Sequence, residues 1–368
     1  MTLKEMNLRV YRGEPLPHVF FQPRFEPWFD WHRQFNSLPG SLQEMTVRDT
    51  YDMLGASMRY VQYYTGQPEP MRFQFTDEVK ITEQREGDLL KKRYDTPHGP
   101  LFQTQKHTVD NTWRTIEFPA KRAEDLAALR WVLERRIISF SAENFKVGAD
   151  YIGDRGEPQF WVPKSPYFAL AQQWMKYEDF IYALMDCRGE MEGIMKAIDD
   201  TYDQLYEQVI ACEQTTIVNF AENIAMAYLS TQFFEEYCIP WYEKRSGQLR
   251  NTGRFTHIHI DGYFKPLLPY LAYLPFDGLE ALTPEPQGDV TLEEMKEYIG
   301  DKVLLDGIPA IYFMPYQPFE KLQECVEKLV ELFYPRLVLG ISDELPEGCS
   351  EDGFNRMKWV AEYSRCKK

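Results

Sequence analysis

The chain has 368 residues, of which 44% are hydrophobic and 15% aromatic, enough to bury one large core or two ordinary ones. Its net charge of −16 argues against nucleic acid or an anionic membrane as the main partner. The sequence contains no run of about 18 apolar residues and no charged-then-apolar leader. The six cysteines form no CxxC pair, which fits a reducing compartment. We therefore expect a cytoplasmic protein without a membrane segment.

The first half of the chain predicts mixed secondary structure. A short strand is expected at His18–Gln22, followed by a helix over 41–66, where apolar residues recur at helical spacing. Between 78 and 108 the pattern alternates and contains turn residues, which predicts a β-hairpin or small meander outside the main body. Helical spacing returns at 122–136 and at 170–213.

Five short apolar runs in the second half are each followed by a helical segment. One of these helices begins with a capping box made by Thr291 and Glu294. Repeated βα units predict a parallel sheet, and the closed form that a chain this long completes has eight strands. We expect an α/β fold, a (βα)8 TIM barrel with an N-terminal embellishment that includes the hairpin, as a single domain over residues 1–368. The five runs are 215–224, 254–262, 276–282, 302–308 and 336–342.

Polar side chains stand at the end of each of these five predicted strands. In a βα barrel the carboxyl ends of the strands meet at one mouth, where active sites are assembled. Acids in such positions also commonly cap the helix that follows. Capping explains any single one of these residues more easily than it explains the whole set. The residues are Glu222, His259, Asp261, Glu280, Asp306 and Asp343.

Capping explains His259 and Asp261 least well, because histidine is a poor cap and residues two apart in a strand share a face. His257 lies one step deeper, so we expect it to support the site from the interior. The imidazole and its neighbouring carboxylates have two possible uses. Either His259, Asp261 and Asp343 hold a Zn²⁺-like ion, or the same groups act as general acid and base without metal.

Three segments of the second half carry a resemblance to a known family: HIDG (His259–Gly262), the stretch 276–308, and LVLGISDELP (337–346). The segment YDTPHGPL (94–101) gives weaker support. They resemble the uroporphyrinogen decarboxylase superfamily, and most closely its corrinoid-dependent methyltransferase branch. The resemblance covers the second half well and the first half loosely, and it implies a TIM barrel.

The resemblance also implies which residues stand at the metal-binding and substrate-binding positions of the family. In the thiol-methylating enzymes of this branch, a His-x-Cys-Gly segment and a later cysteine bind zinc. The histidine falls on His259 here, but the cysteine positions hold Asp261 and Asp343, which points to a harder site for an oxygen-bearing substrate. Only Arg24 and Arg33 remain where the true decarboxylases have an arginine-rich motif, which argues against uroporphyrinogen as the substrate.

These implications predict a methyltransferase that demethylates a small aromatic compound, an aryl methyl ether. The acceptor is the cobalt of a corrinoid (cobalamin), free or on a partner corrinoid protein, with zinc as an optional cofactor. The alternatives are methyl transfer from a corrinoid to tetrahydrofolate or a thiol, uroporphyrinogen decarboxylation, and a non-catalytic barrel that binds a corrinoid protein.

The expected roles divide the candidate residues into two groups. The expected catalytic residues are His259, Asp261, Glu222 and Asp343. Phe25, Trp28 and Trp31 are candidate pocket walls, although core packing is the ordinary role of such side chains. The further candidates for contact with substrate are His257, Glu280 and Asp306.

Overall fold

The computed structural model describes residues 1–367, which form two compact units. Unit 1 comprises 1–70, 142–162 and the part of the chain from residue 213 onward, and unit 2 comprises 71–141 and 163–212. No helix within residues 1–367 is both long and apolar enough to cross a membrane. The expectation of a single domain over the whole chain stays a prediction.

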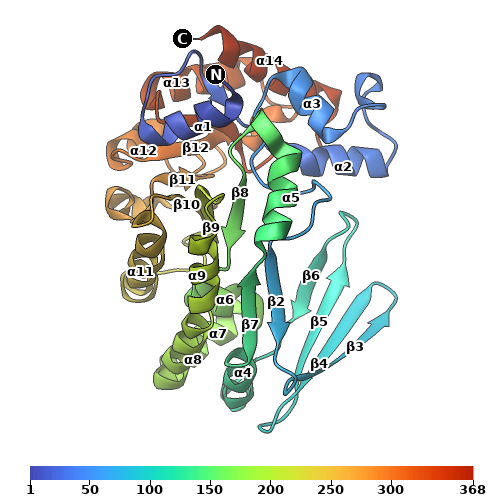
Figure 1. Cartoon of the computed structure of the whole chain (residues 1–368), viewed down its shortest axis with the longest axis vertical. Coiled ribbons are helices and arrows are strands. Elements are labelled where there is room, and N and C mark those ends of the chain that lie inside the picture. The colour runs from blue at the N-terminus through green and yellow to red at the C-terminus, as the bar shows by residue number, and fades with distance from the viewer. Residues whose placement is uncertain (368) are drawn as a thin grey trace. The chain divides into compact units, whose positions relative to one another are not determined.

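A curled parallel sheet of seven strands forms the centre of unit 1 (Figure 1). Its strand order is β1-β13-β12-β11-β10-β9-β8. The five strands expected in the second half are all present, so the βα pattern predicted this part of the sheet correctly. The strands are β1 (Phe20–Phe21), β8 (Gln159–Val162), β9 (Ile217–Ile224), β10 (Phe255–Ile260), β11 (Gly278–Glu280), β12 (Val303–Pro309) and β13 (Leu337–Ser342).

A short extended stretch, residues 57–61, lies between the two edge strands of this sheet and is called the closing segment. The Ser57 amide donates to the Phe21 carbonyl of β1 at 2.9 Å. On the other side, an isolated parallel bridge pairs Tyr60 with Gln159 of β8. The sheet is therefore TIM-barrel-like, but within residues 1–367 the eighth strand of a complete barrel is replaced by this segment.

The helix expected over 41–66 is much shorter in the structure, where α3 spans Val47–Leu54. Gly55 follows with a φ of 61°, the left-handed conformation that commonly ends a helix. The prediction was wrong for the part beyond Gly55. Met58 and Val61 are fully buried and three residues apart, so their spacing fits a helix as well as the extended closing segment that they occupy.

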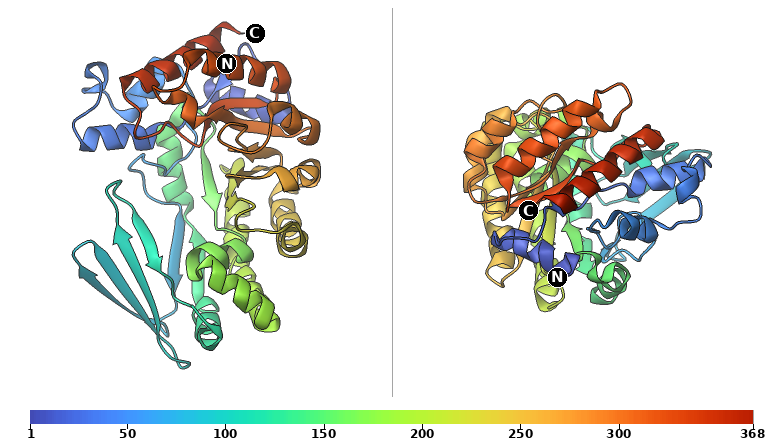
Figure 2. Two further views of the ribbon diagram at one scale, coloured as in Figure 1. Left: turned by 180° about the vertical axis from the view of Figure 1, so that it is seen from behind. Right: turned by 90° about the horizontal axis from the view of Figure 1, so that it is seen from above.

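Most helices of unit 1 lie outside the sheet (Figure 2). The capping box predicted for α12 is confirmed, because the Thr291 hydroxyl accepts from the Glu294 amide at 3.1 Å and the Glu294 carboxylate accepts from the Thr291 amide at 2.9 Å. The remaining helices after α3 are α5 (Ala142–Ile152), α10 (Thr231–Phe233), α11 (Ile239–Arg250), α12 (Leu292–Tyr298), α13 (Phe319–Phe333) and α14 (Glu351–Cys366). A 3₁₀ helix, η6 (Lys265–Tyr273), follows β10, and α2 (Glu26–Gln34) follows β1.

The first helix, α1 (Leu3–Arg12), covers the amino-terminal ends of the strands. It buries Met6, Val10 and Tyr11 in one apolar cluster with the first residues of β9 and β12, Ile217 and Val303. This cluster is the apolar base of the sheet interior. On the side of this cluster toward the carboxyl ends of the strands, the sheet interior is polar.

Unit 2 consists of two antiparallel sheets and a group of helices (Figure 1). Where a hairpin or meander was expected between 78 and 108, the structure has a four-stranded sheet that continues to Glu117. The helical region expected at 170–213 is divided into separate helices. The strands are β2 (Met71–Phe75), β3 (Lys80–Glu86), β4 (Leu89–Asp95), β5 (Leu101–His107), β6 (Trp113–Glu117) and β7 (Arg136–Phe140). The helices are α4 (Leu126–Leu133), α6 (Pro166–Ala169), α7 (Tyr177–Asp186), α8 (Arg188–Asp200) and α9 (Asp203–Ala211).

Candidate functional site

Polar side chains fill the interior of the curled sheet in unit 1 above the apolar base. Nearly every strand supplies at least one of them. Alternate residues of a strand point to the same face, so these side chains occupy the positions that face the interior. Buried polar groups need hydrogen-bond partners, and a fully connected network holds one arrangement. The buried members are Gln22 next to β1, Arg59 in the closing segment, Gln159, Asn219, His257, His259, Glu280 and Asp306.

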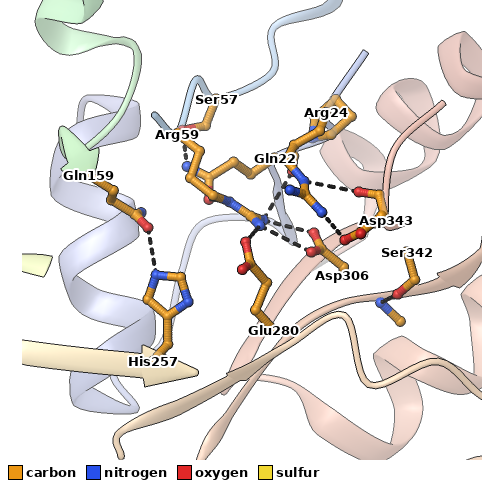
Figure 3. Close-up of polar contacts among 12 residues, drawn as sticks. Gln22, Arg24, Ser57, Arg59, Gln159, His257, Glu280, Asp306, Ser342 and Asp343 are labelled. Carbon is orange, nitrogen blue, oxygen red and sulfur yellow. Dashed lines mark hydrogen bonds and ion pairs between the residues drawn. The ribbon is translucent and has the colours of Figure 1, made fainter. Parts of the chain in front are cut away.

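Arg59 is the centre of this network (Figure 3). Its Nη1 donates to Glu280 Oε1 at 2.6 Å, its Nη2 to Asp306 Oδ1 at 2.8 Å, and its Nε to Gln22 Oε1 at 2.9 Å. Burial lowers the pKa of Arg59, but the two carboxylates outweigh burial and raise it, so the guanidinium is charged. Gly340 of β13 makes room, because a Cβ there would lie 2.4 Å from Asp306 Oδ1.

His259 lies between two carboxylates. Its Nδ1 is 2.9 Å from Glu280 Oε2, and its Nε2 is 3.3 Å from Asp343 Oδ2. Burial lowers the pKa of His259, but Asp343 and Glu280 outweigh burial and raise it to about 10. The imidazole is therefore protonated at neutral pH and donates from both ring nitrogens.

Arg24, which follows β1, holds Asp343 from the other side (Figure 3). Its Nε donates to the Asp343 backbone carbonyl at 2.9 Å, and its Nη2 donates to the Asp343 carboxylate. Burial raises the pKa of Asp343, but Arg24 and His259 outweigh it and hold this pKa well below its usual range. Arg24, Asp343 and His259 form a row of alternating charge, which we call the charged row.

His257 lies deeper, inside the network. Its Nε2 is 3.0 Å from Gln159 Oε1, and its Nδ1 is 3.1 Å from Asn219 Nδ2 (Figure 3 shows the first contact). Neutral imidazole suits both partners, with Nδ1 accepting from the Asn219 amide and Nε2–H donating to Gln159. Burial lowers the pKa of His257 to about 3, so the ring is neutral.

A cavity of about 200 Å³ opens beside the charged row. Aromatic rings form part of its wall, and the ring centroids lie 5.1 Å apart for Tyr60 and Trp161 and 6.0 Å apart for Tyr63 and Trp161. The Asn219 amide donates to the Tyr60 hydroxyl at 2.8 Å. The cavity is lined by Arg24, Tyr60, Tyr63, Trp161, Asn219, Ala221, Asn223, His259, Glu280, Asp343 and Glu344.

The structure brings together part of the residue set expected from the sequence. His259, Glu280 and Asp343 line the cavity, and Asp306 lies behind them on Arg59. Asp261 follows the end of β10, where its side chain is exposed, and it is not among the residues that line the cavity. The shared face predicted for His259 and Asp261 needs a strand through both residues, and β10 ends at Ile260.

Glu222 lies on the opposite face of β9 from the cavity. Asn219, Ala221 and Asn223 line the cavity, whereas Glu222 at the intervening position accepts the Tyr242 hydroxyl of α11 at 3.1 Å. The alternation of this strand gives the signal that could have placed Glu222 correctly. Val218 and Phe220 share its side of the strand, and both are fully buried.

The aromatic residues proposed as pocket walls pack elsewhere in unit 1. The Phe25 ring lies 4.4 Å from that of Tyr51, and the Trp28 ring stacks on Phe354 at 5.3 Å. Trp31 is half-buried on α2. None of the three lines the cavity. Its aromatic wall is provided by Tyr60, Tyr63 and Trp161, which no pattern in the sequence had indicated as site residues.

The expected zinc ligands His259, Asp261 and Asp343 do not fit a zinc ion as they are placed. Within residues 1–367, no three His, Cys, Asp or Glu side chains are arranged to hold a metal. Both nitrogens of His259 face carboxylates of the protein, so neither is directed at an open position where an ion would sit. Arg24 also occupies the Asp343 carboxylate.

The sequence matches no protein-family model and no curated protein at a significant level. The fold is similar to that of a methyltransferase from Methanosarcina mazei, with a TM-score of 0.59, 13% sequence identity and 98% of each chain covered. A B12-independent methionine synthase from Shewanella sp. W3-18-1 follows with a TM-score of 0.42, 11% identity and 89% of each chain covered. A putative B12-independent methionine synthase from Listeria monocytogenes also has a TM-score of 0.42, with 10% identity and 96% of each chain covered.

The similarity to the Methanosarcina mazei protein shows the fold alone, because the two sequences are only 13% identical. It confirms the kind of fold that the family resemblance implied. The two methionine synthases have TM-scores of 0.42 and carry no argument about this chain.

Proposed function

We propose that this protein is a cytoplasmic methyltransferase that removes the methyl group of a small aryl methyl ether. The acceptor is the cobalt of a corrinoid, free or bound to a partner corrinoid protein. The observation that carries the proposal is the imidazole of His259, held between Glu280 and Asp343 on the wall of a small cavity edged by aromatic rings. The fold shared with a methyltransferase supports it.

Breaking the bond between methyl carbon and aryl oxygen leaves the electron pair on oxygen, so a phenolate develops. A cation placed at that oxygen stabilises the developing charge, and it acts more strongly in a site that excludes water. His259 and Arg24 supply positive charge at the cavity wall, and because each is paired with a carboxylate, the ether oxygen has to share the Nε2–H of His259 with Asp343, which lies 3.3 Å away. A Co(I) corrinoid supplies the nucleophile that accepts the methyl group.

The size of the cavity determines where the two reactants meet. A volume of about 200 Å³ accommodates a single substituted ring, whereas pockets for larger organic ligands reach several hundred cubic ångströms. A corrin ring is too large to enter. The donor therefore occupies the cavity with its methyl group facing the mouth, where the corrinoid approaches.

The test is an anaerobic assay of the purified protein with cob(I)alamin and a panel of methoxyphenols, without folate or thiol. Formation of methylcobalamin together with the demethylated phenol supports the proposal. Turnover only with methylcobalamin plus tetrahydrofolate or a thiol overturns it in favour of the reverse transfer. Release of carbon dioxide from uroporphyrinogen without corrinoid would identify a decarboxylase instead.

A further inference from the structure

The cations that line the cavity are already engaged by carboxylates of the protein itself. Arg24 donates to Asp343 through both Nε and Nη2. His259 faces Glu280 with one ring nitrogen and Asp343 with the other. A carboxylate on a ligand would therefore have to displace a protein carboxylate to reach either cation.

A third carboxylate, Glu344, lines the cavity without a cation of its own. It follows Asp343 and is half-buried, and its Oε2 accepts the hydroxyl of Tyr63. No ion pair of Glu344 is found among residues 1–367 within 4.0 Å. Arg24 and His259 are the only cationic side chains among the lining residues, against the three carboxyl groups of Glu280, Asp343 and Glu344. Burial raises the pKa of Glu344, while Arg24 and the hydrogen bond from Tyr63 act in the opposite direction.

The aromatic part of the wall also favours a positively charged ligand over a negatively charged one. The rings of Tyr63 and Trp161 are almost perpendicular to each other, with an interplanar angle of 79°. The hydroxyl of Tyr63 donates a hydrogen bond to Glu344. The faces of aromatic rings carry negative potential and attract cations. At longer range, the net charge of −16 also disfavours the approach of anions.

We propose that Glu344 determines substrate specificity by excluding methyl donors that carry a carboxylate, so that the cavity takes an uncharged or, preferably, an ammonium-bearing methoxyarene. This inference rests on the proposed function for the reaction itself, but it also makes a prediction about binding that needs no corrinoid. An additional carboxylate in the cavity would face Glu344 and Asp343 with no free cation as partner. Like charges brought together in this way oppose binding.

The test compares three methoxyphenols of similar shape that differ in charge: creosol, which is neutral, vanillate, which carries a carboxylate, and vanillylamine, which carries an ammonium group. Binding is measured by titration calorimetry, and kcat/KM by the cob(I)alamin assay. We expect vanillylamine to bind at least as tightly as creosol, and vanillate to bind at least about tenfold more weakly than creosol.

The variant Glu344→Gln isolates the charge, because a glutamine oxygen still accepts the Tyr63 hydroxyl. We expect this variant to reduce the difference between creosol and vanillate to less than about threefold. Glu331→Gln is the control, because it removes the same charge from an exposed position on α13 and should leave the difference unchanged.

The outcomes separate this inference from the proposed function. Equal binding of vanillate and creosol by the unmodified protein overturns the inference, as does an unchanged difference in Glu344→Gln. Failure to demethylate any of the three compounds overturns the proposed function alone. Even in that case, the specificity role of Glu344 would be supported if vanillate bound more weakly than creosol and Glu344→Gln removed this difference.

Discussion

Arg59 Nη1 lies 2.6 Å from Glu280 Oε1, and both side chains are only 1% exposed. The same guanidinium holds Asp306, so one cation compensates two buried carboxylates. Glu280 in turn faces His259. Arg59 does not line the cavity, but it fixes Glu280, and Glu280 positions the imidazole of His259 at the cavity wall.

Replacing Arg59 by methionine should be strongly destabilising. The change leaves Glu280 and Asp306 buried without their shared cation, and removing one partner of a buried ion pair costs about 3–5 kcal/mol. Urea unfolding measures the loss. The matched control is Lys321→Met, which breaks an exposed pair with Glu324 on α13 and should cost less than about 1 kcal/mol. Equal effects of the two substitutions would contradict the central role of Arg59.

His257 should make the protein less stable as the solution becomes more acidic. Its pKa is lowered to about 3 in the folded state, against about 6.5 in an unfolded chain. Between these values only the unfolded state takes up the proton, so the free energy of unfolding falls with falling pH, by up to about 1.4 kcal/mol per pH unit. His257→Gln should flatten the slope between about pH 4.5 and 6.5. The exposed His98→Gln should leave it unchanged.

His259 should have the opposite effect on the alkaline side. Its pKa is raised to about 10 in the folded state, so its contribution to stability is complete below about pH 6.5 and is lost as the pH rises toward 10. In His259→Gln, the free energy of unfolding should depend less on pH between about 7 and 9.5 than in the unmodified protein. A variant with the same alkaline slope as the parent would show that His259 is not held in its charged form.

Filling the cavity should impair substrate binding more than stability. Ala221 lines the cavity and is only half-buried, so a leucine there projects into the space that the donor ring needs. We expect Ala221→Leu to raise KM by about tenfold or more, while the free energy of unfolding changes by less than about 1.5 kcal/mol. Ala142→Leu on the exposed start of α5 controls for the added bulk. Unchanged KM in Ala221→Leu would place the substrate elsewhere.

The second half of the fold could be predicted from the sequence because each strand there is a short apolar run followed by a helix. The same pattern placed His259 and Glu280 correctly in the last residues of their strands and Asp343 directly after its strand. Glu222 was assigned to the site by its position at the end of a strand. The alternation of β9 puts it on the other face, and that alternation was readable in the sequence.

Arg59 could not be found in this way, because its side chain is buried by partners that are far away in the chain. An arginine within an apparent helix normally indicates an exposed face, and Arg59 becomes interior only because Gly55 ends α3 and the closing segment runs into the sheet. Glu280 and Asp306 are more than two hundred positions away from it. Tyr60 and Tyr63, which line the cavity, were missed for the same reason.

The most direct test of the central claim is a single-turnover experiment without oxygen, in which the protein is mixed with cob(I)alamin and creosol and the formation of methylcobalamin is followed by absorbance. The unmodified protein should produce methylcobalamin and the demethylated phenol in equal amounts. His259→Gln should slow this step by about a hundredfold or more, because the charge that stabilises the leaving phenolate is removed. Methylcobalamin formation at the same rate in His259→Gln, or none in the unmodified protein with any donor, would contradict the account.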